Sequence, residues 1–275
     1  MSNSDKMKDS IQEVIKTLMD RVMDRVLNTD PFLVDKHKAE KPLYAFLVPD
    51  EIFKGSHFER RFVTPFGGVW EKLAVVAGNT GLGKAKSQYA ITGNVNAERL
   101  RRIQEVLNKL EHRTSSKDKP DWDKELKYIL SGTSSELIPT TVVCDIYLAT
   151  SSGKRYAFEL KAPLPNSDQT KVSKEKILKL YSMDPAQVDE AYFALPYNPY
   201  GKKEDYAWTF PARWFDMKHD PVVLIGDEFW EKIGGKGTYK AFLSAVDEIG
   251  SGYKERIYKE YLGIDPPDGS IEKKI

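Results

Sequence analysis

The chain has 275 residues, of which 40% are hydrophobic and 30% are charged, and its formal net charge at pH 7 is +1. This length allows one large domain, or a core with a smaller appendage. The near-zero charge excludes a uniformly basic protein, so any surface that binds a polyanion must be a local patch balanced by acid elsewhere.

Cys144 is the only cysteine, which excludes an intrachain disulfide and a cysteine-rich zinc site. We therefore expect a reducing, cytoplasmic setting. The first ten residues are polar and charged, so we expect no signal peptide. No apolar run approaches the roughly 18 residues that a membrane span needs, so we expect no membrane partner.

The first half of the chain is expected to be mainly helical. Residues 67–78 are predicted to form a buried helix, and residues 96–112 a charged amphipathic helix. The polar segment 113–124 is expected to be a loop at a subdomain boundary. Residues 4–28 are also predicted to be helical, with Ser4 or Asp5 as the cap, because apolar residues recur at helical spacing: Met7, Ile11, Val14, Ile15, Leu18, Val22 and Val26. This wide stripe favours burial in the core over a subunit interface.

After residue 138 the pattern changes to strands alternating with helices. Strands are predicted at 141–149, 154–161, 190–196 and 221–226, and helices at 170–183, from Asp227 to about Gly234, and at 238–249. The fold class is therefore α/β (α+β), with a mixed central sheet and flanking helices. We expect a mainly helical part at 1–112, a linker at 113–137, a sheet-containing core with C-terminal helices at 138–264, and a frayed tail at 265–275.

The first two of these strands predict a hairpin that brings charged residues together. If the loop is Ser151-Ser152-Gly153, with Gly153 in the left-handed conformation, the register is centred on Ser152. Asp145 then faces Glu159, and Lys161 shares the face of Glu159 because it lies two residues further along the strand.

Two carboxylates this close are unfavourable unless a cation lies between them. Hard oxygen ligands with open water positions suit Mg²⁺, which polarises phosphoryl oxygens and helps to generate a hydroxide nucleophile. Lys161 is placed to orient water or to stabilise charge in the transition state. The alternative is a surface ion pair on a solvated sheet face. Acid-any-lysine tripeptides also occur at Glu125–Lys127, Asp216–Lys218 and Glu272–Lys274, but only the one at Glu159 lies in a strand behind an acid in register.

The pattern Asp145…Glu159-Leu160-Lys161 resembles the PD-(D/E)xK nucleases, which include type II restriction endonucleases, with Cys144 in place of the usual proline. The segments FERRFVTPFGGVWEKLA and FWEKIGGKGTY are similar in placement to those of enzymes that recognise sites with a CCGG core. The resemblance implies a restriction-endonuclease-like fold. It also implies Mg²⁺-dependent cleavage of double-stranded DNA at a palindrome such as W/CCGGW, 5′-phosphate ends, and a homodimer or higher homo-oligomer.

Enzymes of this superfamily often take a further glutamate from a helix before the hairpin. Glu71, within Val69-Trp70-Glu71, is the position onto which the resemblance carries that role of catalytic residue and metal ligand. The alternative is an ordinary acid on a helix surface.

Between Lys154 and Lys179 seven basic residues stand against three acids, which predicts a DNA-binding patch beside the hairpin. Side chains in and after the loop that starts at Pro163 are candidates for base contacts: Asn166 and Gln169 to adenine, and Lys171 and Lys174 to guanine. The run Lys174-Glu175-Lys176 resembles the basic-acidic-basic element of the CCGG group, although lysine stands for arginine and the distance from Lys161 is longer. The alternative is a solvated helix face.

Gly78–Lys84 fits most of a phosphate-binding P-loop, and Val222–Glu228 loosely resembles the strand and acids that accompany one, so a nucleotide hydrolase is a rival interpretation. Against it, Ala85 stands where a Ser or Thr should hold the metal, Thr92-Gly93-Asn94 would shorten the following helix, and Gly226 interrupts the later strand. We therefore expect no nucleotide cofactor, and Lys84 and Lys86 are candidates for contacts with the DNA backbone. A third interpretation is a DNA-binding protein that keeps the nuclease fold without cleavage.

Overall fold

The computed structural model describes residues 3–113 and 119–272, and the chain divides into two compact units. One is formed by Met1–Leu73 with Lys240–Ile275, and the other by Ala74–Tyr239. This division differs from the one expected, because the helix at 97–111 packs on the sheet instead of joining an N-terminal part. Part of the expected boundary loop, residues 114–118, lies outside the described residues.

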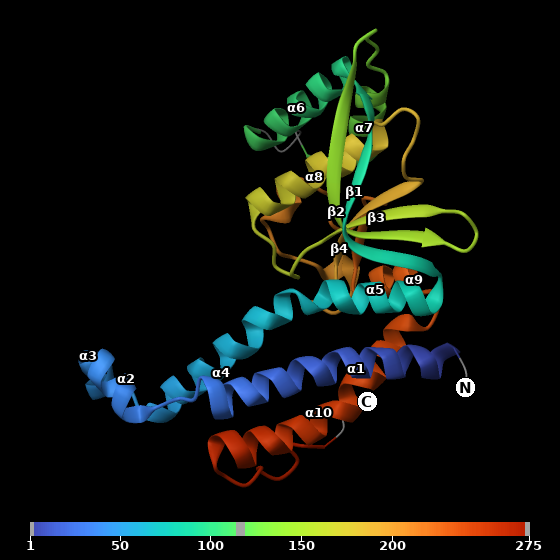
Figure 1. Cartoon of the computed structure of the whole chain (residues 1–275). Helices are drawn as coiled ribbons and strands as arrows, with labels where there is room; N and C mark the ends of the chain where they lie inside the picture. Colours follow the sequence, from blue (N-terminus) through green and yellow to red (C-terminus); the bar gives the residue numbers. More distant parts are fainter. Residues whose placement is uncertain (1–2, 114–118, 273–275) are drawn as a thin grey trace. The chain divides into compact units, whose positions relative to one another are not determined.

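The first unit is helical (Figure 1). Its elements are α1 (Asn3–Asp24), the π-helix η1 (Arg25–Thr29), α2 (Val34–Glu40), α3 (Pro42–Leu47), α4 (Asp50–Gly67), the start of α5 (Val69–Gly81), α10 (Thr238–Arg256) and the π-helix η4 (Ile257–Leu262). The helix predicted over 4–28 is confirmed, although Ser4 and Asp5 lie inside it and do not cap it. Apart from the half-buried Val14, its apolar stripe is buried within the unit, from Met7 at 3% exposed to Val26 at 1%. This stripe therefore belongs to the core, as the sequence favoured. Along α4, aromatic residues four apart stack in a row: Phe58, Phe62 and Phe66.

The second unit holds a five-stranded sheet in the order β1-β2-β3-β4-β5. The strands are β1 (Gly83–Asn96), β2 (Leu137–Thr150), β3 (Arg155–Leu160), β4 (Glu190–Leu195) and β5 (Val223–Ile225). The pairs β1–β2 and β2–β3 are antiparallel, whereas β3–β4 and β4–β5 are parallel. The predicted mixed sheet with flanking helices is therefore confirmed.

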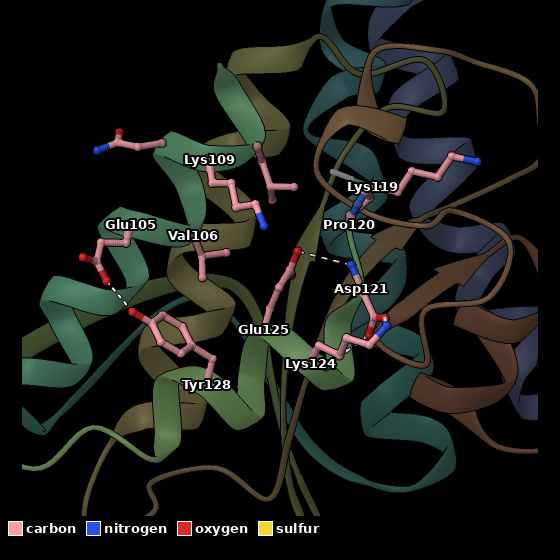
Figure 2. Close-up of a pocket in the computed structure, with 11 residues that line it drawn as sticks. Glu105, Val106, Lys109, Lys119, Pro120, Asp121, Lys124, Glu125 and Tyr128 are labelled. Atoms are coloured by element: carbon pink, nitrogen blue, oxygen red, sulfur yellow. Dashed lines mark hydrogen bonds and ion pairs between the residues drawn. The ribbon is translucent and has the colours of Figure 1, made fainter. Parts of the chain in front are cut away.

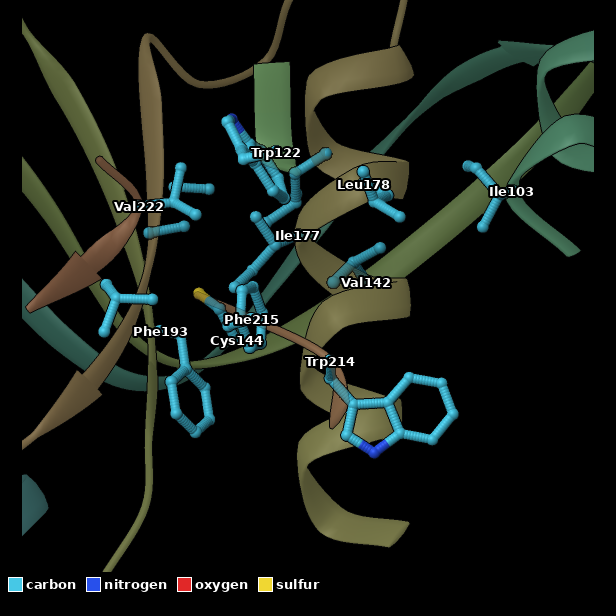
Figure 3. Packing of buried hydrophobic residues seen from close by; sticks show 14 of the residues in the cluster. Ile103, Trp122, Val142, Cys144, Ile177, Leu178, Phe193, Trp214, Phe215 and Val222 are labelled. Carbon is cyan, nitrogen blue, oxygen red and sulfur yellow. The ribbon is translucent and has the colours of Figure 1, made fainter. Parts of the chain in front are cut away.

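Helices cover this sheet and enclose its core. They are α6 (Ala97–Glu111), α7 (Trp122–Leu130), α8 (Ser167–Ser182), α9 (Asp227–Gly234) and two short 3-10 helices, Lys203–Asp205 and Pro211–Arg213. Figure 3 shows the packing of α8 residues Ile177 and Leu178 against Val142, Cys144 and Phe193 of the strands. On β3, Phe158 contacts Phe229 of α9, with ring centroids 5.8 Å apart. The core thus fixes α8 on the sheet beside the β2–β3 hairpin.

Strand β1 was not predicted from the sequence. Its 14 residues fall within 1–112, the part that was expected to be mainly helical. The buried positions Ala85, Ile91 and Val95 do show the spacing of a strand, but Gln88 interrupts the alternation. Its φ is +48°, which side chains other than glycine rarely adopt. The strand is stabilised by its long pairing with β2, and the sequence of β1 alone does not predict this contact.

Helix α7 lies within 113–137, a segment that was expected to be a linker, so that expectation is wrong for Trp122–Leu130. The other strands and helices of the second half begin within a few residues of the predicted positions. The helix expected at 67–78 is α5, which continues to Gly81. Residues 265–272 follow the last helix without regular secondary structure. No helix among residues 3–113 and 119–272 combines the length and the apolar character that crossing a bilayer requires.

Candidate active site

Asp145 lies on β2 and Glu159 lies on β3. These two strands form a hairpin (Figure 1). The bonded pairs, from Ile146–Phe158 to Ala149–Arg155, are all centred on Ser152, so the predicted register is confirmed. The next facing pair in this register is Asp145 and Glu159. At the turn Gly153 has φ of +86°, the left-handed conformation that the predicted three-residue loop requires.

Lys161 completes the predicted triplet. Its Nζ lies 2.7 Å from Asp145 Oδ2 and 3.5 Å from Glu159 Oε2. The backbone N–H of Leu160 also donates to Asp145 Oδ2, at 2.8 Å. The backbone N–H of Lys161 donates to the carbonyl oxygen of Ala194 on β4 at 3.0 Å, which fixes the chain where it leaves β3. The structure therefore brings all three side chains into one cluster.

A fourth charged side chain reaches this cluster from α8. The Nζ atom of Lys176 donates to Glu159 Oε1 at 3.0 Å and to Oε2 at 3.1 Å. The sequence assigned Lys176 to base recognition, but in the structure its ammonium is held by the acid pair. Sequence spacing gave no signal for this contact, because the two residues are 17 apart and lie on different elements.

Burial shapes the electrostatics of the cluster. Glu159 is 1% exposed, and this burial, reinforced by the charge of Asp145, raises its pKa to about 7 against the opposing effect of Lys161 and Lys176. Burial lowers the pKa of Lys161, but the two carboxylates outweigh it and the net shift is upward. Burial and both acids raise the pKa of the Cys144 thiol to about 12, so this thiol stays protonated and unreactive.

The donor set fits a hard divalent cation. Asp145 and Glu159 offer carboxylate oxygens, which Mg²⁺ prefers, and two ammonium groups now supply the positive charge that such a pair needs. In the described part of the chain, no three His, Cys, Asp or Glu side chains are grouped so as to hold a metal ion. An ion here would therefore take two protein carboxylates and fill its other positions with water or phosphate, as Mg²⁺ commonly does.

Asn166 and Gln169, the candidates for adenine contacts, are exposed at the start of α8. Asn166 caps the helix, because its Oδ1 accepts from the backbone N–H of Gln169 at 2.8 Å. The loop before it is held by Tyr206 and Trp208, whose side chains donate to the carbonyl oxygens of Pro163 and Pro165 at 2.8 Å each. The helix start is thus well anchored, and its contact with DNA stays a prediction.

Lys174 is buried, which corrects the expectation that it contacts guanine. Its side chain is 0% exposed and pairs with Glu125 of α7 at 2.5 Å. Its ammonium also donates to the carbonyl oxygen of Trp214. Because Lys174 and Lys176 point to different acids, the run Lys174-Glu175-Lys176 does not form one base-reading element. The sequence did carry a signal, since Lys174 lies at helical spacing from the buried Ile177 and Leu178.

Three further charged residues of α8 form ion pairs. Lys171 pairs with Glu111 at 2.6 Å, and Glu175 pairs with Lys179 at 2.7 Å. All four side chains keep partial exposure. Contacts of Lys171 and Glu175 with DNA stay predictions.

The glycine-rich segment 78–84 does not form a phosphate-binding loop. Gly78 and Gly81 lie in α5 and Lys84 lies in β1, so the chain runs from helix to strand, whereas a P-loop joins a strand to the start of a helix. Close packing explains the glycines instead. A Cβ atom at Gly81 would lie 1.8 Å from the carbonyl oxygen of Gly234, and one at Gly83 would lie 2.1 Å from that of Ala149. The nucleotide-hydrolase alternative therefore loses its structural basis.

Lys84 and Lys86 are exposed along β1, next to the strand that carries Asp145. The ammonium of Lys86 lies 5.3 Å from the ring centroid of Tyr89, which stacks on Tyr147 of β2. Their contact with the DNA backbone stays a prediction.

Gln88 is a residue that the sequence analysis missed. The β1–β2 register passes from Ser87–Ile146 to Tyr89–Cys144, which places Gln88 opposite Asp145. Its left-handed φ of +48° is a local strain of the kind that clusters at functional sites. A polar residue that breaks a strand pattern was the only available signal.

Glu71 lies in the first turn of α5, within the helical unit and just before the chain enters the sheet unit. Its role as a further catalytic acid and metal ligand stays a prediction.

A cavity of about 760 Å³ lies in the sheet unit, apart from the acid pair (Figure 2). Its lining comes from α6, α7 and the chain before α7, and includes Glu105, Asp121, Glu125 and Tyr128. Tyr128 O–H donates to Glu105 at 2.5 Å, and the backbone N–H of Asp121 donates to Glu125 at 3.2 Å. The carboxylates of the hairpin do not line it, so it is not the candidate active site.

Comparison with known proteins decides the family. The family described as type II restriction endonuclease, HinfI, matches residues 7–250 of the chain, which is most of its length. The chain belongs to this family. The match of this HinfI-family chain includes the hairpin, Lys176 and β1.

Curated relatives agree with the family match. The chain is 25% identical over 268 residues to the type II restriction enzyme HgiEI of Herpetosiphon aurantiacus, which covers 94% of this chain and 95% of that enzyme. It is 26% identical over 226 residues to HgiCII of the same organism, with 81% and 82% covered. It is 25% identical over 236 residues to HgiBI, also of that organism, with 84% and 85% covered. The type II restriction endonuclease function expected from the sequence is therefore supported across nearly the whole chain.

Proposed function

We propose that this HinfI-family chain is a Mg²⁺-dependent restriction endonuclease of the PD-(D/E)xK class, which acts in the cytoplasm on double-stranded DNA at a palindromic sequence. The observation that carries the proposal is the convergence of Asp145, Glu159 and Lys161 on one hairpin of a mixed sheet. The alternative of an ion pair on a solvated face disagrees with the burial of Glu159, which is 1% exposed.

Each side chain has a distinct role in the proposed reaction. Asp145 and Glu159 hold Mg²⁺, which when bound polarises a phosphoryl oxygen and lowers the pKa of coordinated water. Lys161, within hydrogen-bonding reach of both carboxylates, orients the attacking water and stabilises the negative charge that develops on the phosphoryl group. The water oxygen bonds to phosphorus and loses its proton to solvent. The bond from phosphorus to the 3′ oxygen breaks and this oxygen takes a proton from solvent, which leaves a 5′-phosphate and a 3′-hydroxyl.

Contacts with DNA are proposed for residues around the hairpin. Lys84, Lys86 and Lys171 would neutralise phosphates, and Asn166 and Gln169 would reach base edges from the exposed start of α8. The CCGG core implied by the resemblance loses its expected base-reading element, because Lys174 and Lys176 pair with Glu125 and Glu159.

The direct test is incubation with plasmid DNA and Mg²⁺ in the absence of ATP. Discrete fragments with 5′-phosphate ends that disappear on addition of EDTA are expected, because hydrolysis by this site needs a divalent cation but no nucleotide. Binding of DNA without cleavage in Mg²⁺ or Mn²⁺ would contradict the proposal and favour a DNA-binding protein that keeps the fold.

We also propose that the protein acts as a homodimer, since a two-fold enzyme matches a two-fold sequence. The apolar stripe of α1, considered above as a subunit interface, is buried in the core and is not available for one. Large apolar side chains are instead exposed on α2, α3 and α4, with Phe46 at 88% and Leu47 at 80%. The charges beside them are of both signs, as in Asp35-Lys36 of α2, which suits a second copy better than it suits DNA.

A further inference from the structure

Lys176 is the main counter-ion of Glu159. Its ammonium lies 3.0 and 3.1 Å from the two carboxylate oxygens, whereas Lys161 lies 3.5 Å from one of them and is closer to Asp145, at 2.7 Å. A buried carboxylate needs such a partner, because an unpaired charge in this environment is costly. Each acid of the pair therefore has its own lysine.

The contact belongs to Lys176 and is not a general property of α8. Three other lysines of the helix are paired elsewhere, Lys171 with Glu111, Lys174 with Glu125 and Lys179 with Glu175. The side chain of Lys176 is also 29% exposed, so it is accessible from solvent. It can therefore exchange this partner for a ligand that arrives from outside.

Mg²⁺ and Lys176 would compete for the two carboxylate oxygens of Glu159. Both oxygens of Glu159 already accept from Lys176, so a cation that binds Glu159 must take at least one of them from the lysine. A divalent ion would also be repelled by two ammonium groups at hydrogen-bonding distance from the same carboxylates. A DNA phosphate at the site would relieve both effects by drawing the ammonium to itself.

We propose that Lys176 couples Mg²⁺ loading to DNA: it competes with Mg²⁺ for Glu159 in the free protein and transfers its charge to a phosphate of the bound DNA. This inference rests on the proposed function. It implies reciprocity, so that DNA raises the affinity for Mg²⁺ and Mg²⁺ raises the affinity for DNA by the same factor. Lys176 would thus keep the free protein poorly loaded with metal.

The test compares Lys176→Met with wild type and with Lys179→Met. Lys179 is a matched control because it lies on the same helix with the same 29% exposure but pairs with Glu175. Mg²⁺ alone is titrated calorimetrically into DNA-free protein at alkaline pH. Single-turnover cleavage of plasmid DNA is then measured at saturating Mg²⁺, and thermal unfolding reports whether each variant folds.

Lys176→Met is expected to bind Mg²⁺ about tenfold more tightly than wild type, since one competing ion pair is gone, and yet to cut at least about tenfold more slowly. Lys179→Met should match wild type in Mg²⁺ affinity, because its ammonium pairs with Glu175 and not with the acid pair. Lys176→Arg, which keeps the charge, should keep the weak Mg²⁺ affinity. If the Met variant fails to fold, the Arg variant replaces it in the comparison with wild type. A purely structural role would weaken metal binding and cutting together.

Mg²⁺ affinity in Lys176→Met equal to or below that of wild type would overturn the competition. Tighter binding with wild-type cutting would overturn the transfer of charge to phosphate. If the wild-type protein neither binds Mg²⁺ nor cuts DNA with it, the proposed function itself fails, and that result is distinct from both of the others.

Discussion

At the acid pair, charge compensation is divided between two lysines from different elements. Lys161 follows Glu159 on the same strand and lies nearest to Asp145, whereas Lys176 comes from α8 and holds Glu159. Two buried carboxylates side by side repel each other. The two lysines offset part of this repulsion, although burial still raises the pKa of Glu159 to about 7.

Lys161→Ala is predicted to lower single-turnover cleavage by about 100- to 1,000-fold, the effect of removing one donor that stabilises a developing charge. DNA binding should change only a few-fold, because many phosphate contacts remain. Lys127→Ala is the control, since Lys127 ends another acid-any-lysine tripeptide, in α7 and outside the hairpin. Normal cutting by Lys161→Ala would show that the catalytic centre lies elsewhere.

The raised pKa of Glu159 predicts a pH dependence. In the metal-free protein the carboxyl is protonated below about 7, whereas its ordinary pKa is 4.5. At limiting Mg²⁺, cleavage should therefore rise by about tenfold per pH unit up to about 7 and then level off. More Mg²⁺ should move the rise to lower pH, because metal and proton compete for the same oxygens. A rise centred near 4.5 at limiting Mg²⁺ would contradict this assignment.

The raised pKa of Glu159 also makes the stability of the fold depend on pH. Because the folded pKa lies above the ordinary one, Glu159 stabilises the metal-free fold fully below about 4.5, and this contribution is lost as pH rises through about 7. Addition of Mg²⁺ should restore stability on the alkaline side, measured as a rise in the melting temperature.

Among the elements, the hairpin is determined locally and β1 is not. The turn at Gly153 fixes the register of β2 against β3, and the alternation of buried Phe158 and Leu160 fixes which face carries Glu159. Strand β1 depends on its partner β2, and its glycines depend on packing. Gly78 and Gly81 give α5 room beside neighbouring elements, which explains their P-loop-like spacing without a nucleotide.

Gly81→Ala is predicted to destabilise the protein by about 2–3 kcal/mol, the cost of overpacking, because the new methyl group would meet the backbone of Gly234. Gly250→Ala is the control, since nothing lies within 4 Å of a Cβ atom there and alanine favours its helix. Denaturant unfolding measures both. Equal stability of the two variants would contradict the close approach at Gly81.

On the scale of the whole molecule, the sheet unit holds Asp145, Glu159, Lys161 and Lys176, and the helical unit holds Glu71 and the exposed apolar side chains of α2 to α4. Eight of the exposed large hydrophobic residues lie between 33 and 63: Leu33, Val34, Leu43, Tyr44, Phe46, Leu47, Ile52 and Val63. A patch of this kind marks an interaction site in a protein that is otherwise well packed.

Phe46→Glu is predicted to shift the protein from dimer to monomer in sedimentation experiments, because it places a charge in the proposed interface. Leu137→Glu is the control, since Leu137 is 54% exposed but lies at the end of β2. As the variant loses its ability to dimerise, its cleavage of a palindromic site should also decrease. A wild-type protein that sediments as a monomer with and without DNA would contradict the proposed dimer.

The sequence by itself determined the hairpin, its register and the convergence of Asp145, Glu159 and Lys161, because a two-fold side-chain period and a short turn are local properties. It also determined most helices, through the spacing of their apolar residues. It did not determine the partners of Lys174 and Lys176, which were expected to contact bases and instead pair with Glu125 and Glu159.

Only the tertiary structure decided which acid each lysine of α8 pairs with. The packing of Ile177 and Leu178 on the sheet sets the rotation of the helix, and this rotation buries Lys174 against Glu125 while it turns Lys176 to Glu159. Likewise, the pairing of β1 with β2 places Gln88 opposite Asp145. These contacts join residues far apart in the chain, so their free energy depends on the assembled sheet and not on any local pattern.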